Sequence, residues 1–222
     1  MTDSIGSIAI LGGTGDLGGG LARQWSRAGY RILIGSRTLG KGEAAAQALL
    51  DEFSDLNVTG HENLDAATQA DLVVLTVPFE HQLSTLETVK PGLTGKILVD
   101  VTVPLIPPKV GTVQLPASGS AGQQAQEFLG EEVQVVSAFQ NVGAMHLRED
   151  HAIACDVLVC GNKRAARDTV ITLVEAVGLK GWHAGPIANA AAAEALTSVL
   201  IMINRHHGVE GSGIVITGEP TK

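Results

Sequence analysis

Residues 8–28 read IAILGGTGDLGGGLARQWSRA, an apolar run followed by a glycine-rich turn and a stretch compatible with a helix. Gly13, Gly15 and Gly18 have the spacing G-x-G-x-x-G, which allows a tight turn, close approach of the backbone to a pyrophosphate, and close packing of helix on strand. The N–H groups and the dipole at the start of the helix favour an anion. The chain holds 27 glycines, so the spacing alone is weak evidence. Its place between a strand and a helix predicts a dinucleotide site.

The end of the next expected strand indicates which dinucleotide binds. The apolar run at 30–34 is followed by Gly35, Ser36 and Arg37, with Lys41 one helical turn further on. An NAD site normally has Asp or Glu here, about 20 residues past the glycines, to hold the ribose 2′-hydroxyl. A guanidinium is instead a good partner for a 2′-phosphate. The sequence therefore predicts NADP(H) rather than NAD(H), and the alternative is that Arg37 is a solvated loop cation.

Charge and composition restrict the partners. The 15 basic and 23 acidic residues give a net charge of −8, and the basic residues are scattered, which argues against nucleic acid. The first strand begins within the first ten residues, which leaves no room for a secretory signal. The longest uncharged apolar stretch near the C-terminus, 195–203, is far shorter than the roughly 18 residues that a bilayer span needs. We expect a cytoplasmic protein with no membrane partner.

Metal and disulfide sites are not expected. Cys155 and Cys160 lie on or beside a strand with four residues between them, without the other ligands that a metal would need. The seven histidines show no ligand spacing either. A buried thiol is the expected state of Cys160.

Apolar strands alternate with helical stretches along the whole chain. We expect strands at 7–12, 31–35, 72–77, 97–101, 133–138 and 156–160, with a less regular one at 180–184. Helices are expected at 18–28, 40–53, 80–89, 119–129, 163–177 and 188–207. The fold class is α/β, a doubly wound and mostly parallel Rossmann-type sheet with a small C-terminal helical segment. We expect residues 1–185 to form the NADP-binding domain and residues 186–222 to add a C-terminal helix and tail.

Ligands of such sheets bind at the carboxyl ends of the strands, where the strand order reverses. The residues that follow the strands are therefore site candidates: 13–17, Ser36 and Arg37, Thr76 to Pro78, 102–104, and 138–141. Pro78 could present a flat surface to a nicotinamide or simply end its strand. The irregular stretch 104–124 is either a cover over the site or ordinary surface loop, and Ser120 is expected to cap the helix after it.

The last expected helix is rich in alanine at 190–193 and apolar on more than one side from Leu196 to Ile203. Apolar residues around the whole circumference imply burial, either within the chain or against a second subunit. A homodimer is the favoured interpretation because so small a chain has little else to cover such a helix.

The chain has no recognisable nucleophile with a base, no P-loop and no set of metal ligands. His81 is the best candidate for an acid or base, but it opens an expected helix, so a structural role is favoured and no catalytic residue is assigned. Direct hydride transfer between two flat rings needs mainly positioning, with the carbons about 3–3.5 Å apart in a water-poor cleft. The cofactors carry that chemistry.

Several segments together resemble one family, the NADPH-dependent reductases of the deazaflavin coenzyme F420, or F420-dependent NADP oxidoreductases. The matching segments span nearly the whole chain in order: 11–18, 35–37, 75–81, 135–139, 156–161 and 184–186. The resemblance implies reversible hydride transfer between NADPH and C5 of the deazaflavin.

The resemblance also implies roles for individual residues. Those around the pyrophosphate would be Thr14, Gly15, Asp16 and Leu17, and those around the 2′-phosphate Ser36, Arg37 and Lys41. Val77, Pro78 and His81 would lie near the nicotinamide, and the turn with Ala138, Gln140, Asn141 and Val142 would shape the deazaflavin pocket with the start of the last helix. The chain departs from the family at Thr38, where a second basic residue is frequent, and at Gln140, where some members have His.

Two other functions remain open from the residues alone. One is an NADP-dependent reductase of a flavin, a ferric complex or an imine, and the other is a non-catalytic NADP(H)-sensing module. A sensor is more often joined to an effector domain, and imine reductases usually add a large helical domain. This chain has room for little more than one long helix, which favours the deazaflavin reductase.

Overall fold

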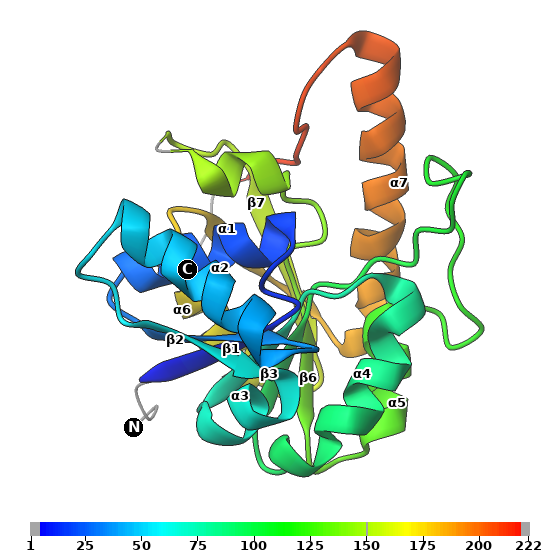
Figure 1. Cartoon of the computed structure of the whole chain (residues 1–222). Coiled ribbons are helices and arrows are strands. Elements are labelled where there is room, and N and C mark those ends of the chain that lie inside the picture. The colour runs from blue at the N-terminus through cyan, green and yellow to red at the C-terminus, as the bar shows by residue number, and fades with distance from the viewer. Residues whose placement is uncertain (1–4, 150, 219–222) are drawn as a thin grey trace.

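The computed structural model describes residues 5–149 and 151–218. Its core is an eight-stranded sheet with the order β3-β2-β1-β4-β5-β6-β7-β8, covered by helices on both faces (Figure 1). The strands are β1 Ser7–Leu11, β2 Arg31–Ser36, β3 Val58–Glu62, β4 Leu72–Leu75, β5 Ile97–Asp100, β6 Gln134–Ser137, β7 Asp156–Gly161 and β8 Lys180–Gly185. All neighbours are parallel except β6 and β7. The doubly wound, mostly parallel sheet is confirmed.

The helices divide between the two faces. They are α1 Asp16–Arg27, α2 Leu39–Glu52, α3 Asn63–Gln69, α4 Gln82–Val89, α5 Ala121–Leu129, α6 Arg164–Ala176 and α7 Ala190–His207. One buried apolar cluster joins the sheet to α1, α2 and α6, and the other joins it to α3, α4 and α5. The strand order reverses between β1 and β4, so their carboxyl ends form the crevice in which such sheets bind ligands.

The sequence patterns missed β3 and α3. β3 is the edge strand, and of its residues only Val58 is buried. A strand with one buried side chain has no apolar alternation to detect. α3 has only seven residues, too few for a helical period to show. β4 also ends earlier than expected, so Thr76 to Pro78 lie in the loop after it.

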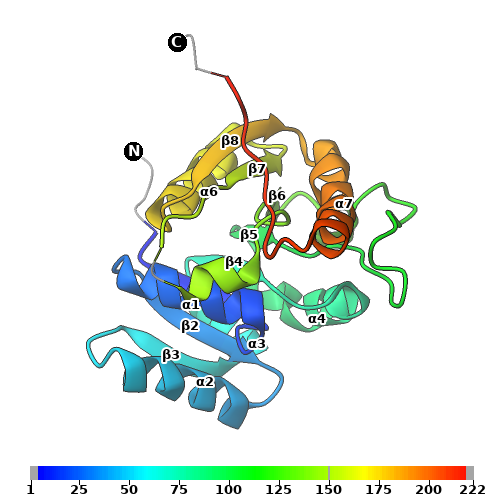
Figure 2. The ribbon, with the colours of Figure 1, turned by 90° about the horizontal axis from the view of Figure 1, so that it is seen from above.

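α7 stands apart from the layers and rises beyond the rest of the molecule (Figure 1). The irregular loop of residues 101–120 runs beside it (Figure 2), and Ser198 Oγ donates to the carbonyl of Thr112 at 3.4 Å. Val199, Met202 and Ile203 are 45%, 47% and 39% exposed. The alternative that this face of the helix is buried within the chain is therefore wrong. After Gly208 the chain turns back, and the carbonyl of Ile214 accepts from the N–H of Asp156 at 2.7 Å.

Among the described residues, one helical run, Ile187–His207, is long and apolar enough by length and composition to cross a membrane. Its mean hydropathy is 1.4, and 33% of it is buried inside the molecule. The apolar stretch expected from the sequence was shorter because Glu194 interrupts it. One such helix is weak evidence, since core helices have the same length and composition.

Candidate functional site

The glycine turn between β1 and α1 depends on its glycines for packing. A Cβ on Gly18 would lie 2.5 Å from Thr76 Oγ1 and 2.8 Å from the Cα of Gly13, so no side chain fits there. A Cβ on Gly13 would lie 2.9 Å from the carbonyl of Ile10. Gly15 is the N-cap of α1, and no side chain caps this helix. The turn thus presents backbone N–H groups at a helix N-terminus, as a pyrophosphate site requires.

A cavity of about 370 Å³ joins this turn to the ends of β2 and β4. It brings together most of the residues expected to hold the dinucleotide. The lining residues are Gly12, Thr14, Gly15, Ser36, Arg37, Asn63, Thr76, Val77, Pro78, His81, Ser84 and Thr85. The strands position these residues because β1, β2 and β4 are parallel neighbours whose carboxyl ends meet at one edge of the sheet.

Arg37 lies where the 2′-phosphate is expected. Ser36 ends β2 and is 6% exposed, whereas the side chain of Arg37 is exposed at the cavity. Within residues 5–149 and 151–218 the guanidinium has no hydrogen-bond or ion-pair partner, so it is available to an anion. Lys41 is exposed in the first turn of α2 and lies outside the lining of the cavity.

The far end of the cavity is formed after β4. Thr76 is fixed by its hydroxyl, which donates to the carbonyl of Leu11 at 2.8 Å. His81 belongs to a short 3₁₀ turn, Phe79–His81, and its side chain caps no helix. Its ring is 51% exposed, with Nε2 3.8 Å from Glu80 Oε1. A ring so exposed is poorly placed for the water-free proton transfer of an acid–base catalyst.

The turn after β6 is buried and tightly held. Ala138, Gln140, Asn141 and Val142 are all less than 9% exposed. Gln140 Nε2 donates to the carbonyl of Asp100 at 2.9 Å and to Ser137 Oγ at 2.8 Å, so donation to a bound ring would cost these bonds. The carbonyl of Gln140 accepts from Thr197 Oγ1 at 2.8 Å, which ties this turn to α7.

Two features mark this turn as more than a connection. Phe139 has a φ of 73°, in the left-handed region that non-glycine residues seldom adopt. The amide oxygens of Gln140 and Asn141 are buried without a hydrogen-bond partner among the described residues. The side chain of Leu17, a residue expected beside the pyrophosphate, packs partly buried against the core.

A buried polar network lies beneath the site. Gln82 Nε2 donates to Asp100 and, at 2.9 Å, to the carbonyl of Ala121. Glu194 of α7 accepts from the N–H groups of Ala121 and Gly122 at 2.6 and 3.0 Å, which fastens α7 to the start of α5. Burial raises the pKa of Asp100 to about 6 and the pKa of Glu194 to about 8.

The cysteines are buried and unpaired. Cys155 and Cys160 are both free thiols, as expected for Cys160, and burial raises the pKa of Cys160 to about 11. A thiol with a raised pKa is a poor nucleophile. No group of three or more His, Cys, Asp or Glu side chains in the part of the chain described could hold a metal ion.

Several site residues escaped the sequence patterns. Asn63 lines the cavity but follows the unrecognised strand β3, and Ser84 and Thr85 come from α4. The signal for Glu194 was present, because it is a lone charge in an alanine-rich stretch. Nothing in the local sequence marks Arg148, which reaches the start of α1 from far along the chain.

The comparisons with known proteins agree with this geometry. Residues 7–104 match the model of a family described as NADP oxidoreductase coenzyme F420-dependent. An F420-dependent NADP reductase of Methanocaldococcus jannaschii is 40% identical over 95% of this chain and 97% of its own length. A protein of the same name from Methanothermobacter marburgensis is 38% identical over 96% of this chain and 99% of its own.

A solved structure shares the whole architecture. It is a candidate F420-dependent NADP-reductase from Arthrobacter sp. FB24, with a TM-score of 0.82 and 27% identity, covering 97% of this chain and 100% of that one. The resemblance noted in the sequence is therefore confirmed over nearly the full length. The chain belongs to the family of F420-dependent NADP reductases.

Proposed function

We propose that this enzyme transfers a hydride reversibly between NADPH and the deazaflavin coenzyme F420. The observation that carries the proposal is the cavity in which the glycine turn, Arg37 and Pro78 meet. It offers a helix N-terminus to the pyrophosphate, a guanidinium to the 2′-phosphate and a small apolar wall to the nicotinamide. The family membership supplies the second carrier, F420, as the co-substrate.

Each part of the dinucleotide has residues suited to it. Gly13, Thr14, Gly15, Asp16 and Gly18 would surround the pyrophosphate, while Ser36 and Arg37 hold the 2′-phosphate with Lys41 nearby. Thr76, Val77, Pro78 and His81 would position the nicotinamide. Neither position 36 nor position 37 carries an acidic residue that could hold a ribose 2′-hydroxyl. Ser36 and Arg37 therefore favour NADP(H) over NAD(H).

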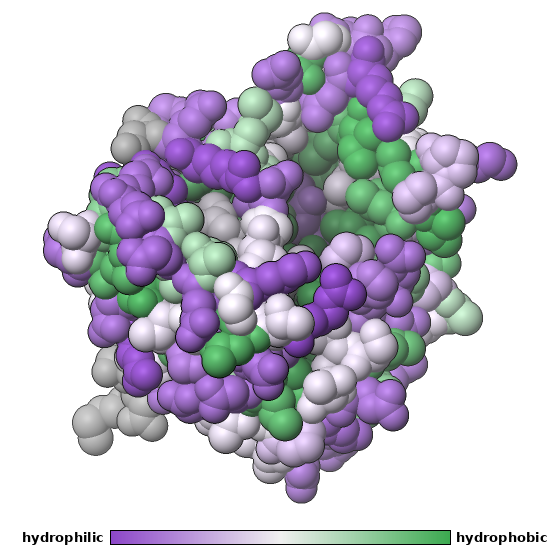
Figure 3. Space-filling view, in the orientation of Figure 1, coloured by the Kyte–Doolittle hydropathy of each residue, from purple (hydrophilic) through white to green (hydrophobic). Residues whose placement is uncertain are grey.

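The deazaflavin pocket would lie between the turn after β6 and α7. The space-filling view shows a hollow there, with hydrophobic side chains gathered on its α7 side (Figure 3). Apolar walls suit a flat aromatic ring and exclude water from the reacting carbons. The backbone carbonyl of Gln140 accepts from Thr197 Oγ1, and this hydrogen bond holds the turn after β6 against α7.

The reaction balances without a catalytic acid fixed by the protein. The hydride leaves C4 of NADPH with both electrons and bonds to C5 of the deazaflavin, and the reduced deazaflavin takes one proton at its ring nitrogen from solvent. The protein has to hold the two rings face to face and keep water from the reacting carbons. That division of labour fits an exposed His81 and buried, unreactive thiols.

We also infer a homodimer in the cytoplasm. The exposed apolar face of α7, formed by Val199, Met202 and Ile203, would be covered by a second copy of the chain. In this division, residues 1–185 bind NADP(H), and residues 186–222 complete the deazaflavin pocket and provide the dimer contact. We expect no nucleic acid or membrane among its partners, since the chain carries a net charge of −8.

Mixing the purified protein with NADPH and oxidised F420 tests the proposed reaction. We expect the visible absorbance of the deazaflavin to bleach as NADPH is consumed in equal amount. A flavin, a ferric chelate and a cyclic imine serve as alternative acceptors in parallel. Intact NADPH binding without bleaching across a broad pH range, or faster turnover of another acceptor, would contradict the assignment.

A further inference from the structure

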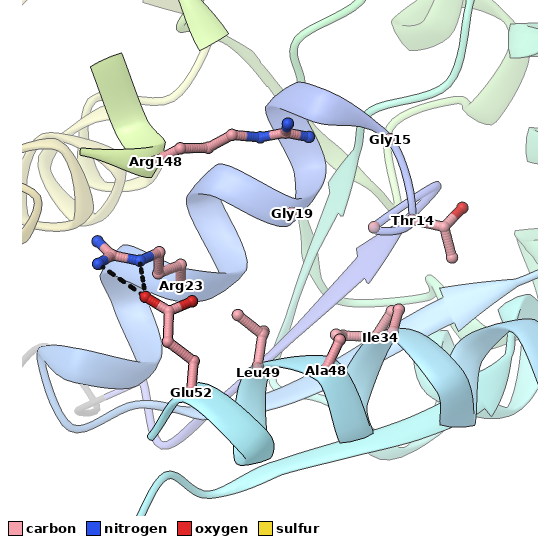
Figure 4. A pocket seen from close by; sticks show the side chains of 11 residues that line it. Thr14, Gly15, Gly19, Arg23, Ile34, Ala48, Leu49, Glu52 and Arg148 are labelled. Carbon is pink, nitrogen blue, oxygen red and sulfur yellow. Dashed lines mark hydrogen bonds and ion pairs between the residues drawn. The ribbon is translucent and has the colours of Figure 1, made fainter. Parts of the chain in front are cut away.

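A second cavity adjoins the glycine turn, and Arg37 is not among its described lining residues. Its volume is about 370 Å³, and it lies between α1 and α2, as Figure 4 shows. Thr14 and Gly15 line both cavities, so the turn is the wall that they share. Among the lining residues that the structure describes, Arg148 alone comes from the C-terminal half of the chain.

The guanidinium of Arg148 lies over the first turn of α1 (Figure 4). It is paired with the carboxylate of Asp16. The two residues are 132 positions apart, so only the fold brings them together. The side chains are 53% and 80% exposed. An ion pair this exposed contributes little to folding stability, and its place at the turn calls for another explanation.

The backbone before Arg148 is firmly placed. Leu147 is fully buried, and its carbonyl accepts from Gln24 Nε2 of α1 at 2.8 Å. A Cβ on Gly20 would lie 2.7 Å from the Cβ of Leu147, so a glycine is needed for this approach. The short 3₁₀ helix Ala144–Arg148 is therefore fixed on α1 and directs Arg148 toward the N-terminal end of that helix.

The charge of Asp16 makes a cation necessary at this point. Asp16 is the first residue of α1, where a pyrophosphate would sit on the backbone N–H groups. A carboxylate there repels the doubly charged pyrophosphate, and the net charge of −8 adds to the repulsion. A guanidinium beside Asp16 offsets the carboxylate and has further N–H donors for phosphate oxygens.

We propose that Arg148 contacts the pyrophosphate of NADP(H) across the N-terminus of α1, and that Asp16 holds the guanidinium in place for the nucleotide. The proposal rests on the proposed function only in taking the nucleotide to be NADP(H). Arg37 and Arg148 then bind different phosphate groups of the nucleotide, each from one of the two cavities that share the turn. Arg37 distinguishes NADPH from NADH, whereas Arg148 binds the pyrophosphate that the two nucleotides share.

The test is direct binding of NADPH and of NADH, followed by nucleotide fluorescence without F420. Arg148→Gln should raise the dissociation constant of both nucleotides by about tenfold, the loss of one charge-assisted hydrogen bond. Arg164→Gln is the matched control, since Arg164 forms an equally simple exposed pair with Asp168 at 3.9 Å on α6. It should leave both constants unchanged, and thermal melts should show all variants folded.

A second substitution, Asp16→Asn, distinguishes direct contact between Arg148 and the pyrophosphate from simple neutralisation of the Asp16 charge by Arg148. If Arg148 binds the pyrophosphate, the double variant Asp16→Asn/Arg148→Gln binds more weakly than the wild type, because removing the repelling carboxylate does not restore the lost contact. Recovery of wild-type affinity in the double variant would overturn the proposal, because Arg148 would then only neutralise Asp16. Unchanged binding in Arg148→Gln, or a loss confined to NADPH, would also overturn it. Because F420 is absent, a failure of hydride transfer would leave this test intact.

Discussion

Arg37 is the residue on which the choice of dinucleotide depends. Its guanidinium lies at the cavity beside Ser36, in the position where an NAD site carries a carboxylate. We expect Arg37→Ala to weaken NADPH binding by about 1.5–3 kcal/mol, the range of a charge-assisted hydrogen bond, and to leave NADH binding nearly unaffected. Dissociation constants from fluorescence titration measure both values.

Arg31 provides the control for Arg37. It is exposed at the start of β2, at the other end of the strand from Arg37, so Arg31→Ala removes an arginine charge without approaching the cavity. Its dissociation constants should match those of the wild type. Equal losses of NADPH and NADH binding in Arg37→Ala would show that this residue does not read the 2′-phosphate.

Gly18 should tolerate no side chain. An added Cβ would lie 2.8 Å from the Cα of Gly13 and 2.9 Å from the carbonyl of Gly12, and both are backbone atoms of the turn. We expect Gly18→Ala to lower the free energy of unfolding by about 1–3 kcal/mol, as overpacking does, and to weaken NADPH binding as the turn shifts. Urea unfolding and nucleotide titration measure the two effects.

Gly19 is the adjacent control because its nearest contact, the carbonyl of Gly13, would lie 3.5 Å from an added Cβ. Gly19→Ala should be neutral or stabilising by up to about 1 kcal/mol, since alanine is the better helix former. Equal behaviour of the two alanine variants would mean that the G-x-G-x-x-G spacing does not control the packing of this turn.

The sequence predicts residues whose role follows from local chain geometry, as at Gly18 and Arg37. It does not reveal roles that depend on side-chain direction. The turn with Gln140 was expected to shape the deazaflavin pocket, but the sequence did not indicate that the Gln140 amide donates inward to Ser137 and to the carbonyl of Asp100. Arg148 was not predicted because it lies far from Asp16 in the sequence, and only the folded chain brings the two side chains into contact.

Among the elements, α7 is joined to α5 by a titratable group. Glu194 is 1% exposed, and burial raises its pKa from 4.5 to about 8. A raised pKa means that the folded state holds the proton more tightly than the unfolded chain. The stability that this proton contributes is complete below pH 4.5 and is lost as the pH rises through about 8.

The window from pH 6 to 8 isolates this effect. Asp100 has its pKa raised to about 6, so its own contribution is lost below that window. We expect the free energy of unfolding of the wild type to fall from pH 6 to 8 relative to that of Glu194→Gln, which cannot titrate. Urea unfolding at several pH values measures the difference, and Glu127→Gln, exposed on α5, is the control. Parallel pH profiles for wild type and Glu194→Gln would contradict the assignment.

Elements with strong apolar runs were predictable, and those whose form depends on neighbours were not. β1 and β4 are buried throughout and were recognised. β3 was not, because Gly60 packs directly on the backbone of α2 and little of the strand reaches the core. Asn63 follows β3 directly and lines the cavity, and it was not predicted as a site residue because β3 was not recognised.

In the whole molecule, the exposed apolar face of α7 is the proposed contact with a second copy of the chain. Val199, Met202 and Ile203 leave an apolar face on a helix of 18 residues. We expect Ile203→Glu to convert a dimer into a monomer, because it places a charge in the proposed interface. Sedimentation over a range of concentrations measures the mass.

Leu64→Glu is the control, since Leu64 is 40% exposed on α3, in another part of the molecule. It should leave the dimer intact. A wild-type protein that sediments as a monomer at all concentrations would rule out the dimer contact on α7.

The doubly wound, mostly parallel sheet was predictable because alternating strands and helices allow few topologies. The way α7 extends beyond the sheet was not predictable, since it depends on tertiary contacts such as that of Glu194 with the start of α5. NADPH deuterated at both C4 positions, used in ordinary water, tests whether a hydride passes directly between the two carriers. We predict one deuterium at C5 of each reduced F420, as measured by mass spectrometry. Reduced F420 without deuterium, or NADPH oxidation that leaves F420 unreduced, would contradict it.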